Sequence, residues 1–368
     1  MTNSSVPSWT YLHDLPFHED AYIDTIRRVL ASGRLLLGPE LRSFESDFAT
    51  YIGTAYGIGC DNATNGLFLA LKSLDIGNGD AVLTVPNTAI PTVSAICQSG
   101  ATPVFCDVDE HGLIDLKSFD IDSHPNLKAI VPVHLFGYPC NMVQINDFAI
   151  QNSLFVIEDC SQAHGTQLDR QLVGTFGHLS VFSFYPTKPL GGIGDAGIIL
   201  TDNEHLANRL FKLRFYGISD DYYATESGYN SRMDEIHAGI LRYKLTKLDS
   251  ILSKRKQIAD YYIQHIDHPC IQFLPPPPNA SPSHYLVPFK FSGDRDNFQR
   301  YLSEAGIGTN VSYRHPIHTM EAYKYLGYKA GDFPRAEALC DSVISFPIFD
   351  SMPQHYLPRI VSVINSHA

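Results

Sequence analysis

The sequence lacks the features that define several classes of protein. Its 27 basic residues are outnumbered by 39 acidic ones, and the resulting net charge of -12 opposes nonspecific binding to nucleic acid. No apolar run approaches the roughly 18 residues that a membrane span needs, and no charged-then-apolar leader opens the sequence. We therefore expect a cytoplasmic protein that binds neither nucleic acid nor a membrane.

Metal-binding and disulfide patterns are also missing. The seven cysteines are odd in number and form no Cys-x-x-Cys pair, so neither a zinc site nor a full disulfide framework is indicated. His315 and His318 lack a third ligand, which makes a metal a poor interpretation. We expect no metal. His318 is instead a candidate substrate contact, with a packed histidine as the alternative.

What is present is a chain of 368 residues, 44% of them hydrophobic, which is enough for a large core and two domains. Apolar runs alternate with helical patterns, and this alternation predicts a mainly parallel sheet with helices on both faces. Two helices are expected first, at 19–32 and 38–52. Strands are expected at 56–60, 81–85, 103–106, 128–133, 154–158, 180–185 and 197–201. Helices are expected between them at 65–74, 91–99 and 142–152.

The later part of the chain predicts a smaller α/β domain. A long helix is expected from about 231 to 263, and the Pro275–Pro278 run is a stiff extended linker. A strand at 285–291 and another near 310 follow, with helices at 294–305, 333–341 and 354–365. We therefore predict a large domain over residues 1–245, and a second unit over 246–368 that joins the long helix to the small domain.

Lys188 is the first candidate for chemistry. It stands between Pro186 and Pro189, after a strand-like run and ahead of a glycine-rich turn. A lysine held in a cleft can lose its proton and attack a carbonyl, which is how Schiff-base enzymes hold pyridoxal phosphate (PLP). A solvated surface lysine is the alternative. The other groups that PLP requires stand at matching places in the sequence and favour the first interpretation.

Two strand ends offer those groups. The segment Asn62–Gly66 joins a strand to a helix, whose N-terminal N–H groups and the Thr64 hydroxyl suit a phosphate, with an ordinary helix cap as the alternative. A buried strand delivers Asp159 at its carboxyl end, where ligands bind in open α/β sheets. A carboxylate there can keep a pyridinium nitrogen protonated. Asp159 is preferred to Glu158 because it lies further beyond the strand, although a helix-capping role is also open.

A dinucleotide-binding motif can be rejected. Gly192–Gly197 fits the Gly-x-Gly-x-x-Gly pattern, which requires a strand before it and a helix after it. The residues that follow, Ile198–Thr201, form an apolar strand pattern instead. The sequence therefore predicts no nicotinamide site.

Several motifs together resemble the DegT/DnrJ/EryC1/StrS sugar aminotransferases. They are Ile157-Glu-Asp159-Cys-Ser-Gln162-Ala-His164-Gly165, Ser183-Phe-Tyr-Pro-Thr-Lys188-Pro-Leu-Gly, Gly194-Asp-Ala-Gly197 and Gly228-Tyr-Asn230-Ser-Arg232, and further matches cover nearly the whole chain. The resemblance implies the type I PLP aminotransferase fold and a homodimer. It also implies transfer of an amino group from L-glutamate to a nucleotide-linked keto sugar.

The same resemblance assigns roles to individual residues. Lys188 would bind PLP covalently and carry protons, Asp159 would meet the pyridine nitrogen, and Gln162 would lie against the ring. The phosphate would be held by Thr64, Asn65 and Ser183 of one subunit and by Asn230 of the other. Two departures stand out: Ala63–Leu67 replaces the usual Gly-Thr-Asp-Ala-Leu, and residues 87–90 offer no aromatic side chain to stack on the ring.

The segments 215–217, 222–223, 310–313 and 316–320 resemble the branch that aminates C3 of dTDP-3-keto-6-deoxyhexoses. Tyr313 and His318 are the substrate contacts expected from this likeness. Amination at C4 of a dTDP- or UDP-4-keto sugar is an alternative. A non-catalytic regulatory protein on the same fold is another, although the complete surroundings of Lys188 favour an enzyme.

Overall fold

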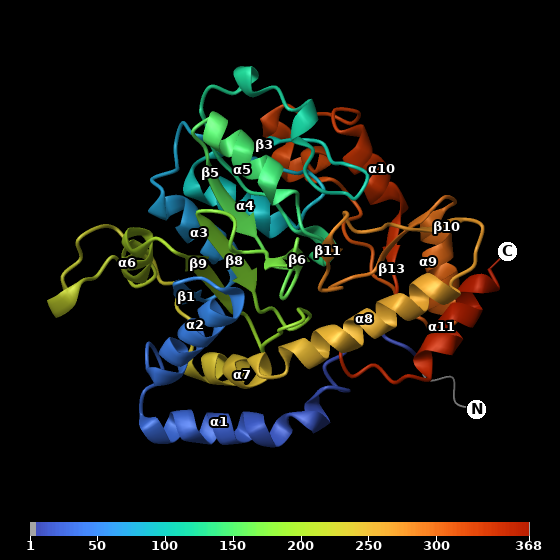
Figure 1. Cartoon of the computed structure of the whole chain (residues 1–368), viewed down its shortest axis with the longest axis horizontal. Helices are drawn as coiled ribbons and strands as arrows, with labels where there is room; N and C mark the ends of the chain where they lie inside the picture. The colour runs from blue at the N-terminus through green and yellow to red at the C-terminus, as the bar shows by residue number, and fades with distance from the viewer. Residues whose placement is uncertain (1–4, 368) are drawn as a thin grey trace.

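A seven-stranded sheet forms the centre of the larger part of the molecule (Figure 1). The computed structural model describes residues 5–367. The order across the sheet is β1-β9-β8-β5-β4-β2-β3. The strands are β1 (Tyr56–Cys60), β2 (Ala81–Thr84), β3 (Thr102–Phe105), β4 (Leu127–Ile130), β5 (Phe155–Asp159), β8 (Leu179–Ser183) and β9 (Gly197–Thr201). Only β9 runs against its two neighbours, while β3, β2, β4, β5 and β8 are parallel. The predicted mainly parallel sheet is confirmed.

Helices bury both faces of this sheet because successive strand residues point to opposite sides. In β9, Ile199 joins the layer that contains α3 (Ala63–Ser73), α4 (Ile90–Ser99) and α6 (Glu204–Leu213). Its neighbours Ile198 and Leu200 join the layer that contains α2 (Pro39–Ile52) and α7 (Glu235–Leu245). Helix α1 (Glu19–Ser32) packs against α7, and α5 (Met142–Gln151) packs against β5.

The smaller part is built on a three-stranded antiparallel sheet. Its strands are β10 (Ile271–Phe273), β12 (Pro288–Phe291) and β13 (Val343–Ser345). Helices α9 (Arg295–Glu304), α10 (Pro334–Ser342) and α11 (Tyr356–Asn365) complete it, and α8 (Leu248–His265) runs into it from the larger part (Figure 1). A short hairpin, β6 (Gln167–Leu168) and β7 (Gln171–Leu172), pairs with β11 (Ala280–Ser281), and the sequence did not indicate it.

Two predictions about the later elements are wrong in detail. The single long helix is two helices, because Thr246 N–H and Lys247 N–H bond to carbonyls three residues back, and the Thr246 hydroxyl bonds to Tyr243 O at 2.8 Å. These bonds end the regular helix. The predicted strand near 310 is only one bridge, between Asn310 and Ser345.

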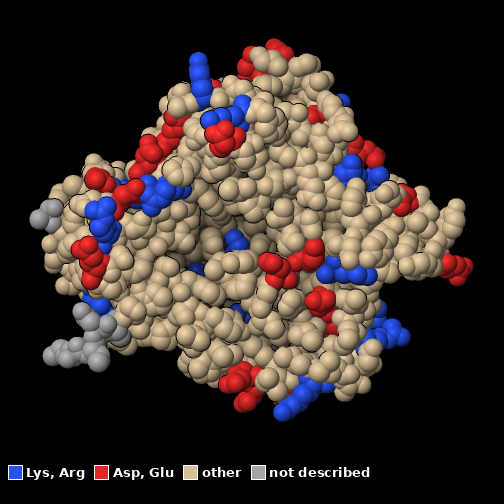
Figure 2. All heavy atoms as spheres, turned by 180° about the vertical axis from the view of Figure 1, so that it is seen from behind, with Lys and Arg blue, Asp and Glu red and all other residues tan. Residues whose placement is uncertain are grey.

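The face turned away from the viewer in Figure 1 is hollowed. Figure 2 shows this face, and atoms of Lys or Arg, in blue, are visible inside the hollow. Among residues 5–367, no helix combines the length and the apolar character needed to cross a membrane.

Candidate active site

A cavity of about 300 Å³ opens where several strands of the large sheet end. Asp159 is the last residue of β5 and Ser183 is the last of β8. The segments that follow β1, β2 and β4 supply further walls, as expected for ligand sites at the carboxyl edge of such sheets. The lining residues are Asn62, Ala63, Thr64, Leu67, Thr88, Ala89, Pro91, Thr92, Val133, Asp159, Ser161, Gln162, Ser183, Tyr185, Lys188 and Asp195.

A tight loop after β8 carries Lys188 into this cavity. Its own N–H donates to Tyr185 O at 2.9 Å, and Gly192 N–H donates to Phe184 O at 2.8 Å, so the loop closes on itself. A Cβ at Gly191 would lie 2.3 Å from Pro186 O, and only glycine fits there. The backbone around Lys188 is therefore fixed before any ligand binds.

The Asp159 carboxylate, which also lines the cavity, is buried and held in one orientation. Its Oδ2 accepts a hydrogen bond from the Thr92 hydroxyl at 2.7 Å, and its Oδ1 accepts one from Ser161 N–H at 3.1 Å. Within residues 5–367, no basic side chain forms an ion pair with it. A negative charge held in this way at a cavity wall suits a cationic ligand atom.

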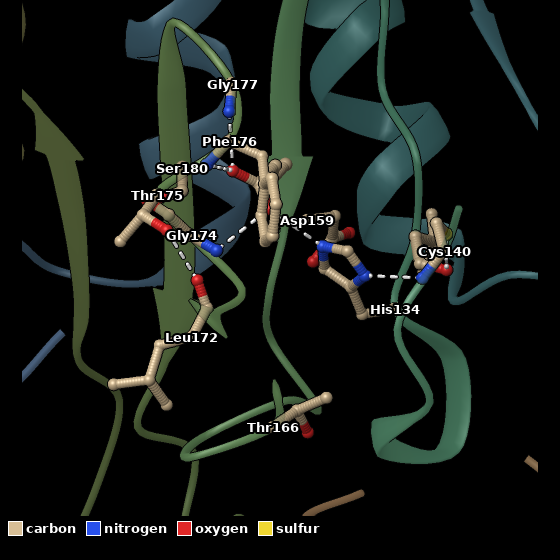
Figure 3. A network of polar contacts seen from close by, with 12 residues as sticks. His134, Cys140, Asp159, Thr166, Leu172, Gly174, Thr175, Phe176, Gly177 and Ser180 are labelled. Carbon is tan, nitrogen blue, oxygen red and sulfur yellow. Dashed lines mark hydrogen bonds and ion pairs between the residues drawn. The ribbon is translucent and has the colours of Figure 1, made fainter. Parts of the chain in front are cut away.

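The neighbouring Glu158 has a different set of partners, which are labelled in Figure 3 as His134, Gly174, Phe176 and Gly177. Its Oε1 accepts from Phe176 N–H at 2.8 Å and Gly177 N–H at 2.7 Å. Its Oε2 accepts from Gly174 N–H at 2.8 Å and pairs with His134 Nε2 at 3.1 Å. This carboxylate ties β5 to the 174–177 loop and has no lone pair directed at the cavity. The structure thus favours Asp159 over Glu158 as the group that meets a ligand.

His134, Glu158 and Cys160 lie close enough together to hold a metal ion, but the His134 and Glu158 side chains are already hydrogen-bonded. His134 Nδ1 accepts from Cys140 N–H at 3.0 Å, which places the ring proton on Nε2, where it is donated to Glu158. Burial raises the pKa of the Cys160 thiol and keeps it protonated. His134 and Glu158 thus form a structural hydrogen-bonded pair, with the buried Cys160 thiol beside it.

Both polar atoms of the Gln162 side-chain amide form hydrogen bonds. Its Oε1 accepts from Phe136 N–H at 2.7 Å, and its Nε2 donates to the Tyr313 hydroxyl at 2.7 Å. Burial raises the pKa of Tyr313, so this phenol stays neutral. Tyr313 comes from the smaller part of the chain, and the structure brings it to Gln162 as part of the site's surroundings.

The predicted phosphate residues do not all reach the cavity. Thr64 and Ser183 line it. Asn65 does not, because its Nδ2 donates to Asp61 Oδ2 at 2.7 Å and its backbone N–H is capped by Asn62 Oδ1 at 2.8 Å. Asn230 is exposed and also lies outside the cavity walls of its own chain.

His318 is not brought to the site. Its side chain is buried, its Nε2 lies 2.9 Å from Glu337 Oε1, and its ring packs edge-on against Phe333 at 4.8 Å. It is absent from the cavity lining. Within this chain, His318 therefore has the position of a packed histidine.

Sequence reasoning missed Thr92 and Tyr285. Thr92 follows β2 at the same edge of the sheet as Asp159. Its place after a predicted strand could have indicated that it lies near the site. Tyr285 lies with its ring 4.4 Å from Lys188 Nζ. No local pattern indicated this contact, because the two residues belong to different parts of the molecule.

A phosphorylated pyridine aldehyde would find a partner for each of its groups at this edge of the sheet. Lys188 would take the aldehyde, Asp159 the ring nitrogen, and the start of α3 with Ser183 the phosphate. Together with the sheet order, that pairing defines the PLP-dependent aminotransferases of fold type I.

The chain belongs to the DegT/DnrJ/EryC1/StrS aminotransferase family, which it matches over residues 17–365. It is 39% identical over 363 residues, 97% of either chain, to the dTDP-3-amino-3,4,6-trideoxy-alpha-D-glucose transaminase of Micromonospora megalomicea subsp. nigra. It is 35% identical over 370 residues, 98% of either chain, to the UDP-N-acetyl-3-dehydro-alpha-D-glucosamine 3-aminotransferase of Acidithiobacillus ferrooxidans. The crystal structure of S. venezuelae DesV matches with a TM-score of 0.94 and 34% identity over 98% of either chain. The predicted family is confirmed: the protein is an aminotransferase, and its cofactor is PLP.

Proposed function

We propose that the protein transfers the amino group of L-glutamate to C3 of a dTDP-linked 3-keto-6-deoxy sugar in the biosynthesis of an amino sugar. The observation that carries this proposal is the meeting of Lys188 and Asp159 in one cavity at the carboxyl edge of the sheet. The nucleotide-linked substrate and the carbon are supported by the relatives. A cytoplasmic location is in keeping with cysteines that are odd in number and form no Cys-x-x-Cys pair.

The residues present fit PLP, which when bound supplies a reactive carbonyl and a ring that withdraws electrons. Lys188 Nζ would anchor it. Asp159, held by Thr92 and Ser161, would keep the ring nitrogen protonated. Gln162 is fixed by two hydrogen bonds and would lie against the ring.

Thr64 and Ser183 would donate their hydroxyls to the phosphate, assisted by the dipole of α3. Gly197 lets this helix start approach β9, because a Cβ there would lie 2.7 Å from Ala63 N.

Lys188 would also carry the proton. As a free amine, its Nζ would take up the α-proton of the amino donor and later release it, and in the second half of the reaction it would act in the opposite direction. The closed loop 185–192 fixes the backbone from which the Lys188 side chain enters the cavity. No other lysine or histidine lines the cavity among the described residues.

The names of two relatives support amination at C3 of the sugar. One is a dTDP-3-amino sugar transaminase and the other is a UDP-linked 3-aminotransferase. The higher identity to the first favours dTDP over UDP. Amination at C4 has no comparable support in these names.

An assay of the purified protein with glutamate and dTDP-linked 3-keto and 4-keto sugars tests the proposal. We expect an amino group at C3, identified by NMR of the product, and no product with Lys188→Ala. Amination only at C4, or a preference for UDP sugars, would contradict the substrate assignment. If the protein is a regulator without turnover, the visible absorbance of lysine-bound PLP will not change on adding glutamate.

A further inference from the structure

Tyr285 makes a close contact with the reactive atom of Lys188. The Nζ atom lies over the face of the tyrosine ring, 4.4 Å from its centroid. The tyrosine hydroxyl lies 3.2 Å from Thr187 Oγ1, on the residue just before the lysine. One side chain therefore contacts both the amine and the loop that carries it.

A buried arginine holds the backbone of Tyr285 in place through hydrogen bonds. Arg255 of α8 is 1% exposed, and its Nη1 donates to the carbonyls of His284 and Tyr285 at 3.2 and 3.3 Å. Its Nε donates to Asp350 Oδ1 at 2.8 Å, which neutralises the charge. Rigid support of this kind fixes a side chain beside a reactive group.

We propose that Tyr285 is a positioning residue for Lys188, whose ring face stabilises the Nζ ammonium whenever the amine is free of the cofactor. The proposal rests on the proposed role of Lys188. The negative face of an aromatic ring attracts a cation without taking its proton. Tyr285 would thus hold Nζ in place and set how readily it gives up a proton.

The charges around the lysine agree with this role. Burial alone would raise the pKa of Tyr285, but Lys188, the Thr187 hydroxyl and Arg255 outweigh it, and the pKa is lowered. No carboxylate whose side chain the structure describes forms an ion pair with Lys188, and its Nζ lies over the Tyr285 ring. The other titratable groups around Lys188 and Tyr285 are Asp159, Asp195, Tyr185 and Tyr313 at the cavity, His164 and Arg255 beneath it, and Asp14, Tyr11, Lys244 and Asp350 behind it.

A carboxylate partner would bind the ammonium too strongly for a proton carrier, because a buried ion pair resists deprotonation. An aromatic face gives a weaker preference for the cation. Such a partner suits an amine that must take up and release a proton in each half of the reaction.

The test measures the reactivity of the Lys188 amine in cofactor-free protein. Acetic anhydride is applied over a pH series, and the labelled peptides are quantified by mass spectrometry, with the exposed Lys254 as internal reference. In Tyr285→Leu, we expect the pH of half-maximal Lys188 labelling to fall by about one unit. In Tyr285→Phe, which keeps the ring, it should stay within about 0.3 unit, and Lys254 should not change in either variant.

Fluorinated phenylalanines at position 285 provide a second series that keeps the shape of the ring and the fold. Each added fluorine weakens the negative face, so the pH of half-maximal labelling should fall stepwise. An unchanged profile in both Tyr285→Leu and the fluorinated series would overturn the proposal.

Borohydride reduction of the wild-type holoenzyme separates the two claims. A PLP adduct found on Lys188 supports the proposed function. An adduct found only on another lysine refutes that function, whereas the labelling profiles decide the role of Tyr285 independently.

Discussion

Asp159 ends β5, Lys188 lies in the loop after the neighbouring strand β8, and the two residues face one cavity with different restraints. The lysine is held mainly through its backbone loop. The carboxylate is held through hydrogen bonds to its own oxygens. Substitution at each should therefore affect different properties of the enzyme.

Lys188→Ala should abolish transamination without unfolding the protein. The side chain is only partly buried, and no other residue of the cavity could replace both the covalent anchor and the proton carrier. We expect turnover to fall by at least about 10⁴-fold, with a normal circular dichroism spectrum. Lys254→Ala, which removes an exposed lysine, is the control. Activity above about a ten-thousandth of wild type would count against the assignment.

Asp159→Asn and Glu158→Gln should have separable effects. Asp159→Asn removes the counter-charge to the ring nitrogen, so the rate should fall by at least about 100-fold while much of the PLP binding remains. Glu158→Gln leaves donors of the 174–177 loop unpaired and should lower the free energy of unfolding by about 2 kcal/mol. Stopped-flow rates and urea unfolding measure the two properties. A near-normal rate for Asp159→Asn would overturn the proposed role of Asp159.

His164 should make the protein sensitive to acid. Its ring packs against Phe48, Phe182 and Phe184, and burial, with a smaller effect of Lys188, lowers its pKa to about 3. The unfolded chain binds a proton near pH 6.5 whereas the native residue stays neutral. Stability is therefore lost as the pH falls from 6.5 towards 3.

Between pH 7 and pH 5, this residue should reduce the free energy of unfolding by about 2 kcal/mol. In His164→Leu this contribution should disappear, and urea unfolding at the two pH values will show a smaller difference than in wild type. His205→Leu, which removes an exposed histidine, should leave the difference unchanged. Equal pH dependence in His164→Leu and wild type would show that the histidine is not buried in a neutral form.

Among the elements, α2 depends on a residue far along the chain. Glu235, the first residue of α7, is buried, and its carboxylate accepts from Gly38 N–H at 2.7 Å, Glu40 N–H at 2.9 Å and Leu41 N–H at 3.1 Å. It thereby caps the N-terminus of α2. A Cβ at Gly38 would lie 2.7 Å from this carboxylate, which explains the glycine there.

Glu235→Gln should lower the free energy of unfolding by about 2 to 3 kcal/mol, because an amide has one acceptor oxygen and its NH₂ would face the N–H groups of α2. Chemical denaturation measures this loss. Glu19→Gln, in the exposed first turn of α1, should cost less than about 0.5 kcal/mol. Similar small losses in both variants would show that the cap is dispensable.

The α7–α8 region shows how element boundaries escape a periodicity argument. Leu241, Leu245, Leu248 and Leu252 are spaced three or four residues apart and share one core cluster in the structure. The helix nevertheless breaks at Thr246 and Lys247, because side-chain and short-range backbone bonds compete with the regular helix there. A shared apolar face does not require one continuous helix.

At the scale of the whole molecule, the segment around 215–230 extends to one side beside α6 (Figure 1). It includes the exposed Asn230, Tyr222 and Tyr223. We propose that a two-fold homodimer places this segment against the partner subunit, where Asn230 would donate to the phosphate in the partner's cavity.

Subunit mixing tests this shared site. Asn230→Asp adds a charge that should repel the phosphate, and Lys188→Ala removes the anchor. A mixed dimer should contain one site with both defects and one with neither, so activity should return towards half that of the wild-type dimer. If heterodimers form and Asn230→Asp alone is impaired, but mixing restores nothing, Asn230 serves its own subunit.

The sequence by itself determined the order of the elements, the mainly parallel sheet, the family and the strand ends that carry Lys188 and Asp159. These features follow from local periodicity and from the motifs, which lie within short stretches of chain. Only the tertiary structure decided that Asn65 bonds to Asp61, that His318 packs against Phe333, and that Tyr285 lies on Lys188. The direction in which a polar side chain points depends on which remote segments offer it a partner, because burying it unpaired costs free energy. The orientation of such a side chain is therefore set only when the chain packs, and no local sequence pattern predicts it.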